Sequence, residues 1–272
     1  MTTPSGFKAR TIWRQVGTQA ALDTLTDHLA VEQPVALQYN GISHAVLLAT
    51  PTHLEDLALG FSYTEGIIRQ ASDVYDIEIE HSEQGCIIHI EIASACLNQL
   101  KQRRRQLAGR TGCGLCGLES LAEGQLKLPP LSPPQQPYAS SAIFTALEQL
   151  RSKQDLHLKT GATHAAAWAS LSGHIEHLRE DVGRHNALDK LIGSLLHHSL
   201  SIDQGFVIVS SRASFEMVQK TAVLGARALV AVSAPTTYAV QMAQDLGVLL
   251  IAFGRDQQFN VYSHAHFLAK DI

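Results

Sequence analysis

The clearest indication of the fold comes from residues 205–255, GFVIVSSRASFEMVQKTAVLGARALVAVSAPTTYAVQMAQDLGVLLIAFGR. It contains three short apolar runs, which are Phe206–Val209, Ala228–Val232 and Val248–Phe253. Between them lie two segments with helical spacing, Phe215–Leu224 and Ala239–Leu246. Apolar runs that alternate with helices are typical of a parallel sheet covered on both faces. We therefore predict a partly parallel, three-layer α/β domain.

The segments upstream extend this domain to residues 139–272. Ser141–Gln154 and Ala187–His198 have helical patterns, and Thr163–Leu171 and His174–Arg179 are expected to form a hairpin around Ser172-Gly173. Five of the nine prolines fall between Pro129 and Pro137, which predicts an extended linker over residues 128–138. Residues 1–127 would then form a separate, smaller domain.

The smaller domain is expected to be α+β. Val35–Tyr39 and His44–Ala49 flank Asn40-Gly41, a strong hairpin signal. Thr52 and Glu55 fit a capping box, which would start a helix that runs to about Gly66. Three further elements are expected downstream: strands at Asp76–Glu80 and Cys86–Ile92, and a helix at Leu97–Leu107.

The parallel strands would end in polar or small residues at one edge of the sheet. These ends are Ser210-Ser211-Arg212, Ser233-Ala234-Pro235 and Gly254-Arg255-Asp256. Ligands of such sheets bind at the carboxyl ends of the strands, and Arg212 and Arg255 suit phosphate groups. Arg184 and His185 precede another helix, and its N-terminus could also bind an anion. We expect an anionic ligand, such as a nucleotide.

Composition excludes several classes of protein. The 272 residues are 45% hydrophobic and carry a net charge of −4, which argues against nucleic-acid binding through bulk charge. The longest strongly apolar run, Gly247–Gly254, is far shorter than the ~18 residues of a membrane helix. The N-terminus lacks a signal-peptide pattern, so we expect a cytoplasmic protein whose four cysteines do not form a disulfide framework.

Two of the cysteines, Cys113 and Cys116, lie in the glycine-rich segment RTGCGLCG, residues 110–117. Five cations precede them: Lys101, Arg103, Arg104, Arg105 and Arg110. Positive charge lowers the pKa of a nearby thiol and favours the nucleophilic thiolate, although each Arg could equally belong to a solvated helix face. Three interpretations remain open on spacing alone: half of a zinc site, a redox pair, or a nucleophilic thiol that carries a group such as sulfur.

The other polar residues give weaker signals. His174-Ile175-Glu176 matches half of a zinc-deaminase motif, but no cysteine follows Cys116 to complete the metal site, so we expect a turn there. His164 could equally be a core residue or a ligand contact. Cys86 and Cys96 alternate with apolar residues and are expected in the core.

Several segments of the sequence together resemble the FdhD family of formate dehydrogenase accessory sulfurtransferases. The segment at 110–117 resembles the signature loop of that family. Further similar blocks follow in family order: TPTHLEDLALGF (50–61), EGII (65–68), TGATH (160–164), REDVGRHNALDK (179–190), SFEMVQK (214–220), SAPT (233–236) and FGR (253–255).

The resemblance implies a homodimeric, cytoplasmic sulfur carrier with a cytidine-deaminase-like C-terminal domain. Cys113 would take sulfur from a cysteine desulfurase as a persulfide, with Cys116 as its partner. The sulfur would pass to the molybdenum bis(molybdopterin guanine dinucleotide) cofactor, which is bound as a substrate before it enters formate dehydrogenase. The guanine dinucleotide would contact the stretch formed by Phe253, Gly254, Arg255, Asp256, Gln257 and Gln258.

One other function stays open. The chain could be a non-enzymatic chaperone that binds the molybdenum cofactor or another nucleotide, with a structural zinc ion at Cys113 and Cys116.

Overall fold

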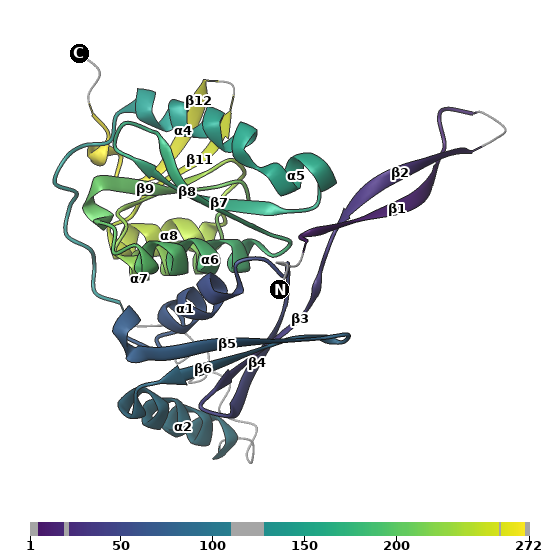
Figure 1. Ribbon diagram of the computed structural model, residues 1–272. Helices are drawn as coiled ribbons and strands as arrows, with labels where there is room; N and C mark the ends of the chain where they lie inside the picture. Colours follow the sequence, from purple (N-terminus) through teal and green to yellow (C-terminus); the bar gives the residue numbers. More distant parts are fainter. Residues whose placement is uncertain (1–4, 19–21, 110–127, 256, 270–272) are drawn as a thin grey trace.

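A computed structural model describes residues 5–18, 22–109, 128–255 and 257–269 of the chain. Figure 1 shows a six-stranded sheet with helices on both faces, a four-stranded sheet beside it, and a long two-stranded ribbon that projects from the body. The fold is mixed α/β, as the sequence predicts. The likeness of the C-terminal part to cytidine deaminase stays a prediction.

The six-stranded sheet has the order β12-β11-β10-β9-β7-β8. Its strands are β7 (His164–Ser170), β8 (Ile175–Asp181), β9 (Gly205–Val209), β10 (Ala228–Ala231), β11 (Leu249–Arg255) and β12 (Gln258–Ser263). β9, β10 and β11 are mutually parallel, which confirms the prediction from residues 205–255. β12 was not predicted; it returns antiparallel to β11 at the edge of the sheet.

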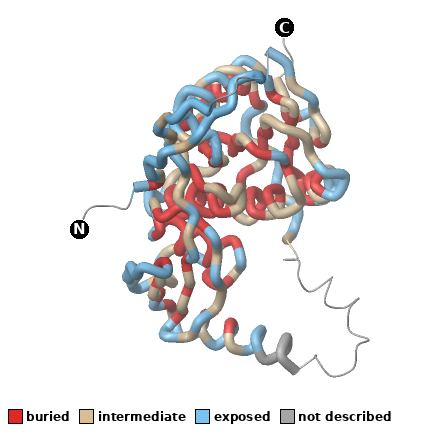
Figure 2. The backbone as a smooth tube through the Cα atoms, turned by 90° about the vertical axis from the view of Figure 1, so that its right-hand side faces the viewer, coloured by how far each residue is buried: buried red, intermediate tan, exposed pale blue. Residues whose placement is uncertain are grey.

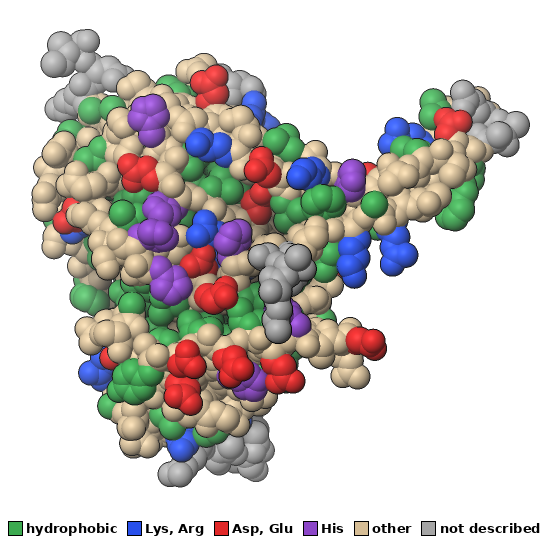
Figure 3. Space-filling model, viewed as in Figure 1, with side chains coloured by type: hydrophobic (Ala, Val, Ile, Leu, Met, Phe, Trp, Pro, Cys, Tyr) green, Lys and Arg blue, Asp and Glu red, His purple; other side chains and the backbone are tan. Residues whose placement is uncertain are grey.

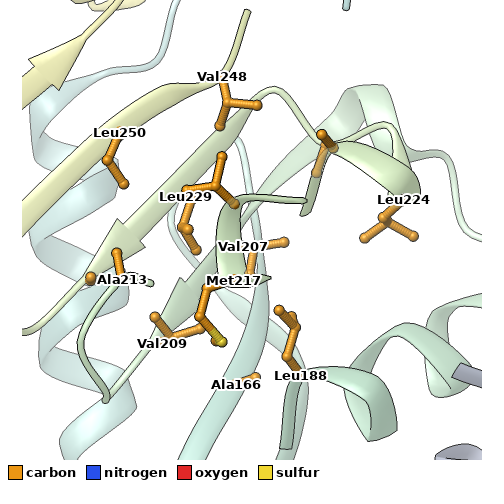
Figure 4. Close-up of a cluster of buried hydrophobic side chains, with 14 of the residues drawn as sticks. Ala166, Leu188, Val207, Val209, Ala213, Met217, Leu224, Leu229, Val248 and Leu250 are labelled. Carbon is orange, nitrogen blue, oxygen red and sulfur yellow. The ribbon is translucent and has the colours of Figure 1, made fainter. Parts of the chain in front are cut away.

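Helices cover both faces of this sheet (Figure 1). They are α4 (Ser140–Lys153), α5 (Asp155–Thr160), α6 (Arg184–His197), α7 (Phe215–Leu224) and α8 (Thr237–Leu246). Val207, Val209 and Leu229 pack toward α6, α7 and α8, as Figure 4 shows for part of this cluster. Phe206 and Ile208 pack toward α4 on the opposite face. Burial on both faces explains why these strands are continuous apolar runs.

The second sheet has the order β4-β3-β6-β5. Its strands are β3 (Gln33–Tyr39), β4 (Ile42–Ala49), β5 (Val74–Ser82) and β6 (Gly85–Ile92), and it is accompanied by α1 (Leu54–Thr64) and α2 (Ser94–Gly109). The predicted Asn40-Gly41 turn is confirmed, with φ of 47° and 77°. Positive φ at both positions is the signature of the turn that matches strand twist.

The predicted capping box at Thr52 is wrong. α1 begins at Leu54, and its N-cap is His53, in the left-handed conformation with φ 54° and ψ 46° and no side-chain capping bond. Because the chain enters the helix one residue later than the motif requires, the Thr52 hydroxyl is not at the capping position.

The ribbon consists of β1 (Phe7–Arg14) and β2 (Asp23–Ala30), paired antiparallel. None of its strand residues is buried, so its sequence lacks the apolar alternation that would have predicted it. Three short 3₁₀ helices complete the described elements: Ala71–Asp73, Ile202–Gln204 and Ala265–Phe267.

The two sheets are joined through α1 and α6, and Figure 2 shows buried backbone where they meet. A Cβ at Gly60 or at Gly193 would overlap a backbone carbonyl of the facing helix, so both glycines are required by close approach. Lys190 Nζ bonds Asp181 Oδ2 at 2.6 Å and the Thr50 carbonyl at 2.8 Å, entirely buried. The predicted linker has no regular secondary structure from residue 128 to 137.

Candidate functional site

The carboxyl ends of four strands lie on one edge of the six-stranded sheet. β7 is antiparallel to both β8 and β9, so β8 runs in the same direction as β9, β10 and β11. We call the residues at or just after the ends of these strands the carboxyl edge: residues 182–185, 210–214, 232–236, 253–255 and 257–258. All of the described residues that the sequence suggested for cofactor binding lie there.

Backbone hydrogen bonds tie these strand ends together. The Ala213 N–H donates to the Ala234 carbonyl at 3.2 Å, and the Thr236 N–H donates to the Ala213 carbonyl at 3.0 Å. The Phe253 N–H donates to the Ser233 carbonyl at 3.3 Å. The carboxyl edge is therefore a connected surface, although Arg212 itself is exposed in the β9–α7 connection.

A cavity of about 220 Å³ lies between α4 and the end of β11. Its lining includes Arg151, Gly254, Arg255 and Gln257. The backbone here is unusual, with φ of 55° at Phe253 and 57° at Gln257, and it interrupts the β11–β12 register. A Cβ at Gly254 would lie 2.7 Å from Leu147 Cδ2, so the close approach of α4 explains this glycine. Asp256 lies outside the described residues.

A second cavity, of about 430 Å³, shares Arg151 with the first. His157, His164 and Ser210 are among the residues that line it. Burial is the main cause that lowers the pKa of His164, and the nearby Arg184 adds to the effect. The structure therefore places His164 at a cavity as a neutral imidazole, half-buried rather than in the core. Arg151 and His157 were not predicted as site residues, because neither lies in a motif.

Arg184 and His185 lie in the first turn of α6, the helix that packs on the opposite face of the sheet from α4. His185 Nε2 is 2.7 Å from Glu216 Oε2 of α7, at ion-pair distance but without hydrogen-bond alignment. Arg184 Nε and the Ser214 hydroxyl are buried and have no hydrogen-bond partner among the described residues. Unsatisfied buried donors are costly, so this cluster suits a ligand with acceptor oxygens.

The N-caps of α6 and α7, Gly183 and Ser214, also make no side-chain capping bond. Their first-turn N–H groups lack the side-chain acceptor that a capped helix has, as in many anion sites. Burial lowers the pKa of His185, and Arg184 adds to this, while the Glu216 carboxylate opposes it. We name Arg184, His185, Ser214 and Glu216 the α6–α7 cluster. Ser214 and Glu216 were not predicted.

The predicted cofactor residues therefore form two groups. β10, β9 and β7 separate β11 from β8, so the strand that precedes Arg184 and His185 lies roughly 19 Å from the strand that carries Phe253, at ~4.8 Å per strand, whereas Ser214 and Glu216 follow β9, two strands from β11. A small anion would reach one group, whereas an extended dinucleotide could reach both.

A buried ion pair connects α6 and α7 near the α6–α7 cluster. Lys220 Nζ bonds both carboxylate oxygens of Asp189, at 2.7 and 2.6 Å, and lies 3.4 Å from Glu65 Oε1. Burial opposes the charge of Lys220, but the Asp189 and Glu65 carboxylates outweigh it and raise the pKa of Lys220. This pair joins α7 and α6 to the end of α1.

Cys113 and Cys116 lie outside the described residues. Of the cations that precede them, Arg103 donates to the Glu65 carbonyl at 3.2 Å and Arg104 to the Ser43 carbonyl at 2.8 Å. These two side chains are therefore anchored to the C-terminal end of α1 and to β4.

The other two cysteines, Cys86 and Cys96, are buried, as expected. Burial raises the pKa of both thiols, which disfavours the nucleophilic thiolate.

His174 is exposed at the β7–β8 turn, as expected, and contacts Gln149 rather than a metal site. Among the described residues, His, Cys, Asp and Glu side chains form no group of three or more that could hold a metal ion. The helices that the structure describes are all too short or too polar to cross a membrane.

Comparison with known proteins agrees with the sequence resemblance. The model of the FdhD/NarQ family matches residues 30–269. A sulfur carrier protein FdhD from Cupriavidus necator is 55% identical over 238 residues, which cover 88% of this chain and 82% of that protein. A protein of the same name from Bordetella bronchiseptica is 51% identical, with coverages of 90% and 88%.

One solved structure is similar over nearly the whole chain. It is a protein from Desulfotalea psychrophila that is described as a formate dehydrogenase accessory protein. It aligns with a TM-score of 0.74 and 21% identity, over 97% of this chain and 100% of that one. At that identity the likeness concerns the fold.

Proposed function

The chain belongs to the FdhD/NarQ family, and from that premise we propose that it is a sulfur carrier that serves formate dehydrogenase. In this proposal Cys113 receives sulfur from a cysteine desulfurase and passes it to the molybdenum bis(molybdopterin guanine dinucleotide) cofactor. The loaded cofactor then enters formate dehydrogenase. The carrier would act in the cytoplasm as a homodimer.

The proposed transfer has two steps. The Cys113 thiolate attacks the outer sulfur of the donor persulfide, so that an S–S bond forms on Cys113 and the donor cysteine leaves as a thiolate. In delivery, the outer sulfur bonds to the metal of the cofactor substrate and Cys113 leaves as a thiolate. The metal supplies the two electrons that reduce the sulfane sulfur to sulfide. Cys116 is proposed as the partner thiol.

The observation that carries the proposal is the convergence of the candidate residues on the carboxyl edge. Phe253, Gly254, Arg255, Asp256, Gln257 and Gln258 are proposed to contact the guanine dinucleotide. The cavity beside Gly254 and Arg255 supports this, and Arg151 adds a further cation at its wall. Guanidinium groups bind phosphate oxygens through paired hydrogen bonds.

Arg184, His185 and Arg212 are proposed to bind phosphate groups. The unpartnered Arg184 Nε and Ser214 hydroxyl support this for the α6–α7 cluster. Because the two groups of residues lie on either side of the same edge, a cofactor with two dinucleotide arms suits the site better than a mononucleotide.

A complementation experiment tests the function. In cells that lack their own sulfur carrier, the wild-type chain should restore formate dehydrogenase activity and the Cys113→Ala variant should not. Cys96→Ala, a buried cysteine outside the motif, is the matched control and should restore activity. Full restoration by Cys113→Ala would contradict the proposal. Stoichiometric zinc that is lost in Cys113→Ala would instead favour the chaperone with a structural metal.

A further inference from the structure

The β1–β2 ribbon is an unusual feature for a single chain. It projects from the body (Figure 1), and none of its strand residues is buried. An isolated two-stranded hairpin is at best marginally stable in water. Its base contacts α5, where Lys159 Nζ lies 5.0 Å from the centroid of the Phe7 ring, and the part that projects further is expected to need a covering surface.

Exposed hydrophobic side chains gather on the same part of the molecule. Nine large hydrophobic residues are exposed in the described chain, and seven of them belong to the ribbon, its turn or the four-stranded sheet: Trp13, Val16, Leu22, Leu29, Val46, Leu48 and Tyr75. Clustered exposed apolar residues mark interaction surfaces. The N-terminal strands are therefore the part of the chain expected to be covered by a partner.

The ribbon has one charged face and one uncharged face. Cross-strand pairing places Lys8 beside Leu29, Arg10 beside Asp27 and Arg14 beside Asp23 on one face, with Ile12 opposite Leu25 between them. Alternation puts Phe7, Ala9, Thr11 and Trp13 on the other face. The charged face thus combines three cations and two carboxylates with three apolar side chains.

The four-stranded sheet offers a matching surface. Its inner residues, such as Val35, Leu37 and Ile88, pack in one core cluster with α1. The pairing places the alternate residues on the opposite face, which we call the outer sheet face. It carries apolar side chains near β4 and carboxylates near β5: Pro34, Ala36, Val46, Leu48 and Ile87, then Asp76, Glu78, Glu80, His89 and Glu91.

The outer sheet face carries carboxylates and no Lys or Arg, so its charge is negative. The four strands contain no Lys or Arg. Figure 3 shows acidic side chains in a row over this sheet and basic side chains along the ribbon. Opposite charges on two exposed surfaces favour their association and fix its register.

The ribbon does not lie on the outer face of its own sheet. β2 continues after Val31 and Glu32 into β3, so the ribbon is an extension of its own sheet and points away from it (Figure 1). A second copy of the chain, in contrast, can present its outer sheet face to the ribbon. In a twofold dimer the exchange is reciprocal, so each ribbon covers the partner.

We propose that the charged face of the β1–β2 ribbon packs on the outer sheet face of a second copy, and that this reciprocal exchange forms the homodimer. The inference rests on the proposed homodimer and specifies its surface. Lys8, Arg10 and Arg14 meet the carboxylates near β5, and Leu25 and Leu29 meet the apolar residues near β4.

Charge reversal tests this surface. One variant carries Lys8→Glu and Arg14→Glu on the ribbon, and the other carries Asp76→Lys, Glu78→Lys and Glu91→Lys on the outer sheet face, so that the net charge of each surface changes sign. In either variant alone both contacts repel, so the dimer dissociation constant should rise by about a hundredfold or more. In an equal mixture, the reversed ribbon meets the reversed sheet and the native ribbon meets the native sheet, so a heterodimer should form.

Sedimentation and native mass spectrometry measure the outcome, and circular dichroism verifies that each variant is folded. Monomeric single variants that form a heterodimer on mixing support the proposal. A monomeric wild type, variants that dimerise like wild type, or a mixture that stays monomeric would each overturn it. Sulfur loading of Cys113 is measured separately, so failure of the sulfur-carrier function is distinguishable from failure of the surface.

Discussion

His185 Nε2 lies 2.7 Å from Glu216 Oε2, and this contact joins the first turn of α6 to the first turn of α7. In the same cluster, Arg184 Nε and the Ser214 hydroxyl are buried and have no hydrogen-bond partner among the described residues. Burial lowers the pKa of His185, and the Glu216 carboxylate is the strongest of the groups that oppose this effect.

Removal of the Glu216 charge should lower the pKa of His185 further. Burial and Arg184 already lower it, and Glu216→Gln takes away the carboxylate that raises it. An NMR titration of the imidazole resonances measures the shift, with Glu176→Gln, an exposed carboxylate on β8, as the control. An unchanged or higher pKa of His185 in Glu216→Gln would contradict this account of the cluster.

The free energy of unfolding should fall as the pH falls below about 6.5. Burial is the main cause that lowers the pKa of His44, His53, His164, His177 and His185. A histidine with a lowered folded-state pKa binds its proton more readily in the unfolded chain. Its contribution to the free energy of unfolding is therefore complete above its pKa in the unfolded chain. That contribution is lost as the pH falls toward its lower pKa in the folded protein.

Urea unfolding at pH 7.5 and 5.5 measures this effect, with lower stability expected at pH 5.5. In His164→Gln the difference between the two pH values should be smaller, because one of the titrating groups is absent. Equal stability at both pH values would show that the histidines are not held neutral by the fold.

Arg151→Ala should weaken the binding of guanosine diphosphate by roughly tenfold, since a hydrogen bond to a charged group contributes about 1.5–3 kcal/mol. Arg151 lines both cavities at the carboxyl edge, so it can reach a phosphate in either. Titration calorimetry measures the affinity, and Arg69→Ala is the matched control because Arg69 is exposed on the other half of the chain. Equal losses of affinity in both variants would show that the cavity is not part of the proposed site.

Lys220→Met should destabilise the fold by about 3–5 kcal/mol, because it leaves the buried Asp189 carboxylate without its partner. Chemical denaturation measures the change. Glu176→Gln removes an exposed carboxylate on β8, outside the outer sheet face, and serves as the control, with an expected loss below about 1 kcal/mol. A loss of similar size in the two variants would show that the Lys220–Asp189 pair does not hold α7 against α6.

The predictability of the fold depended on which faces of each element are buried. The strands β9, β10 and β11 are buried on both faces and were predictable as apolar runs, with α7 at its observed limits. The β1–β2 ribbon was not predicted, because neither of its faces is buried. β12 lies at the sheet edge, where partial exposure gives only a weak alternation. The prediction of Thr52 as the N-cap of α1 was wrong, because His53 adopts the left-handed conformation and is itself the N-cap.

The residues of the site were predictable only where they lie close to a strand end in the sequence. Arg184, His185, Arg212 and the Phe253–Arg255 run stand next to strand ends, and sequence order places them at the carboxyl edge. Arg151 reaches the same edge from α4, and Glu216 reaches His185 from another helix. Such contacts depend on how α4, α6 and α7 pack, which no local pattern encodes.

The most direct test of the account is the mass of the protein after incubation with a cysteine desulfurase and cysteine. If Cys113 carries the sulfur, the protein should gain about 32 Da, one sulfur atom, that peptide mapping assigns to Cys113 and that is absent in Cys113→Ala. Cys86 and Cys96, which are buried with raised thiol pKa values, should stay unmodified. An unmodified Cys113, or sulfur found equally on Cys86 or Cys96, would contradict the assignment of Cys113 as the sulfur carrier.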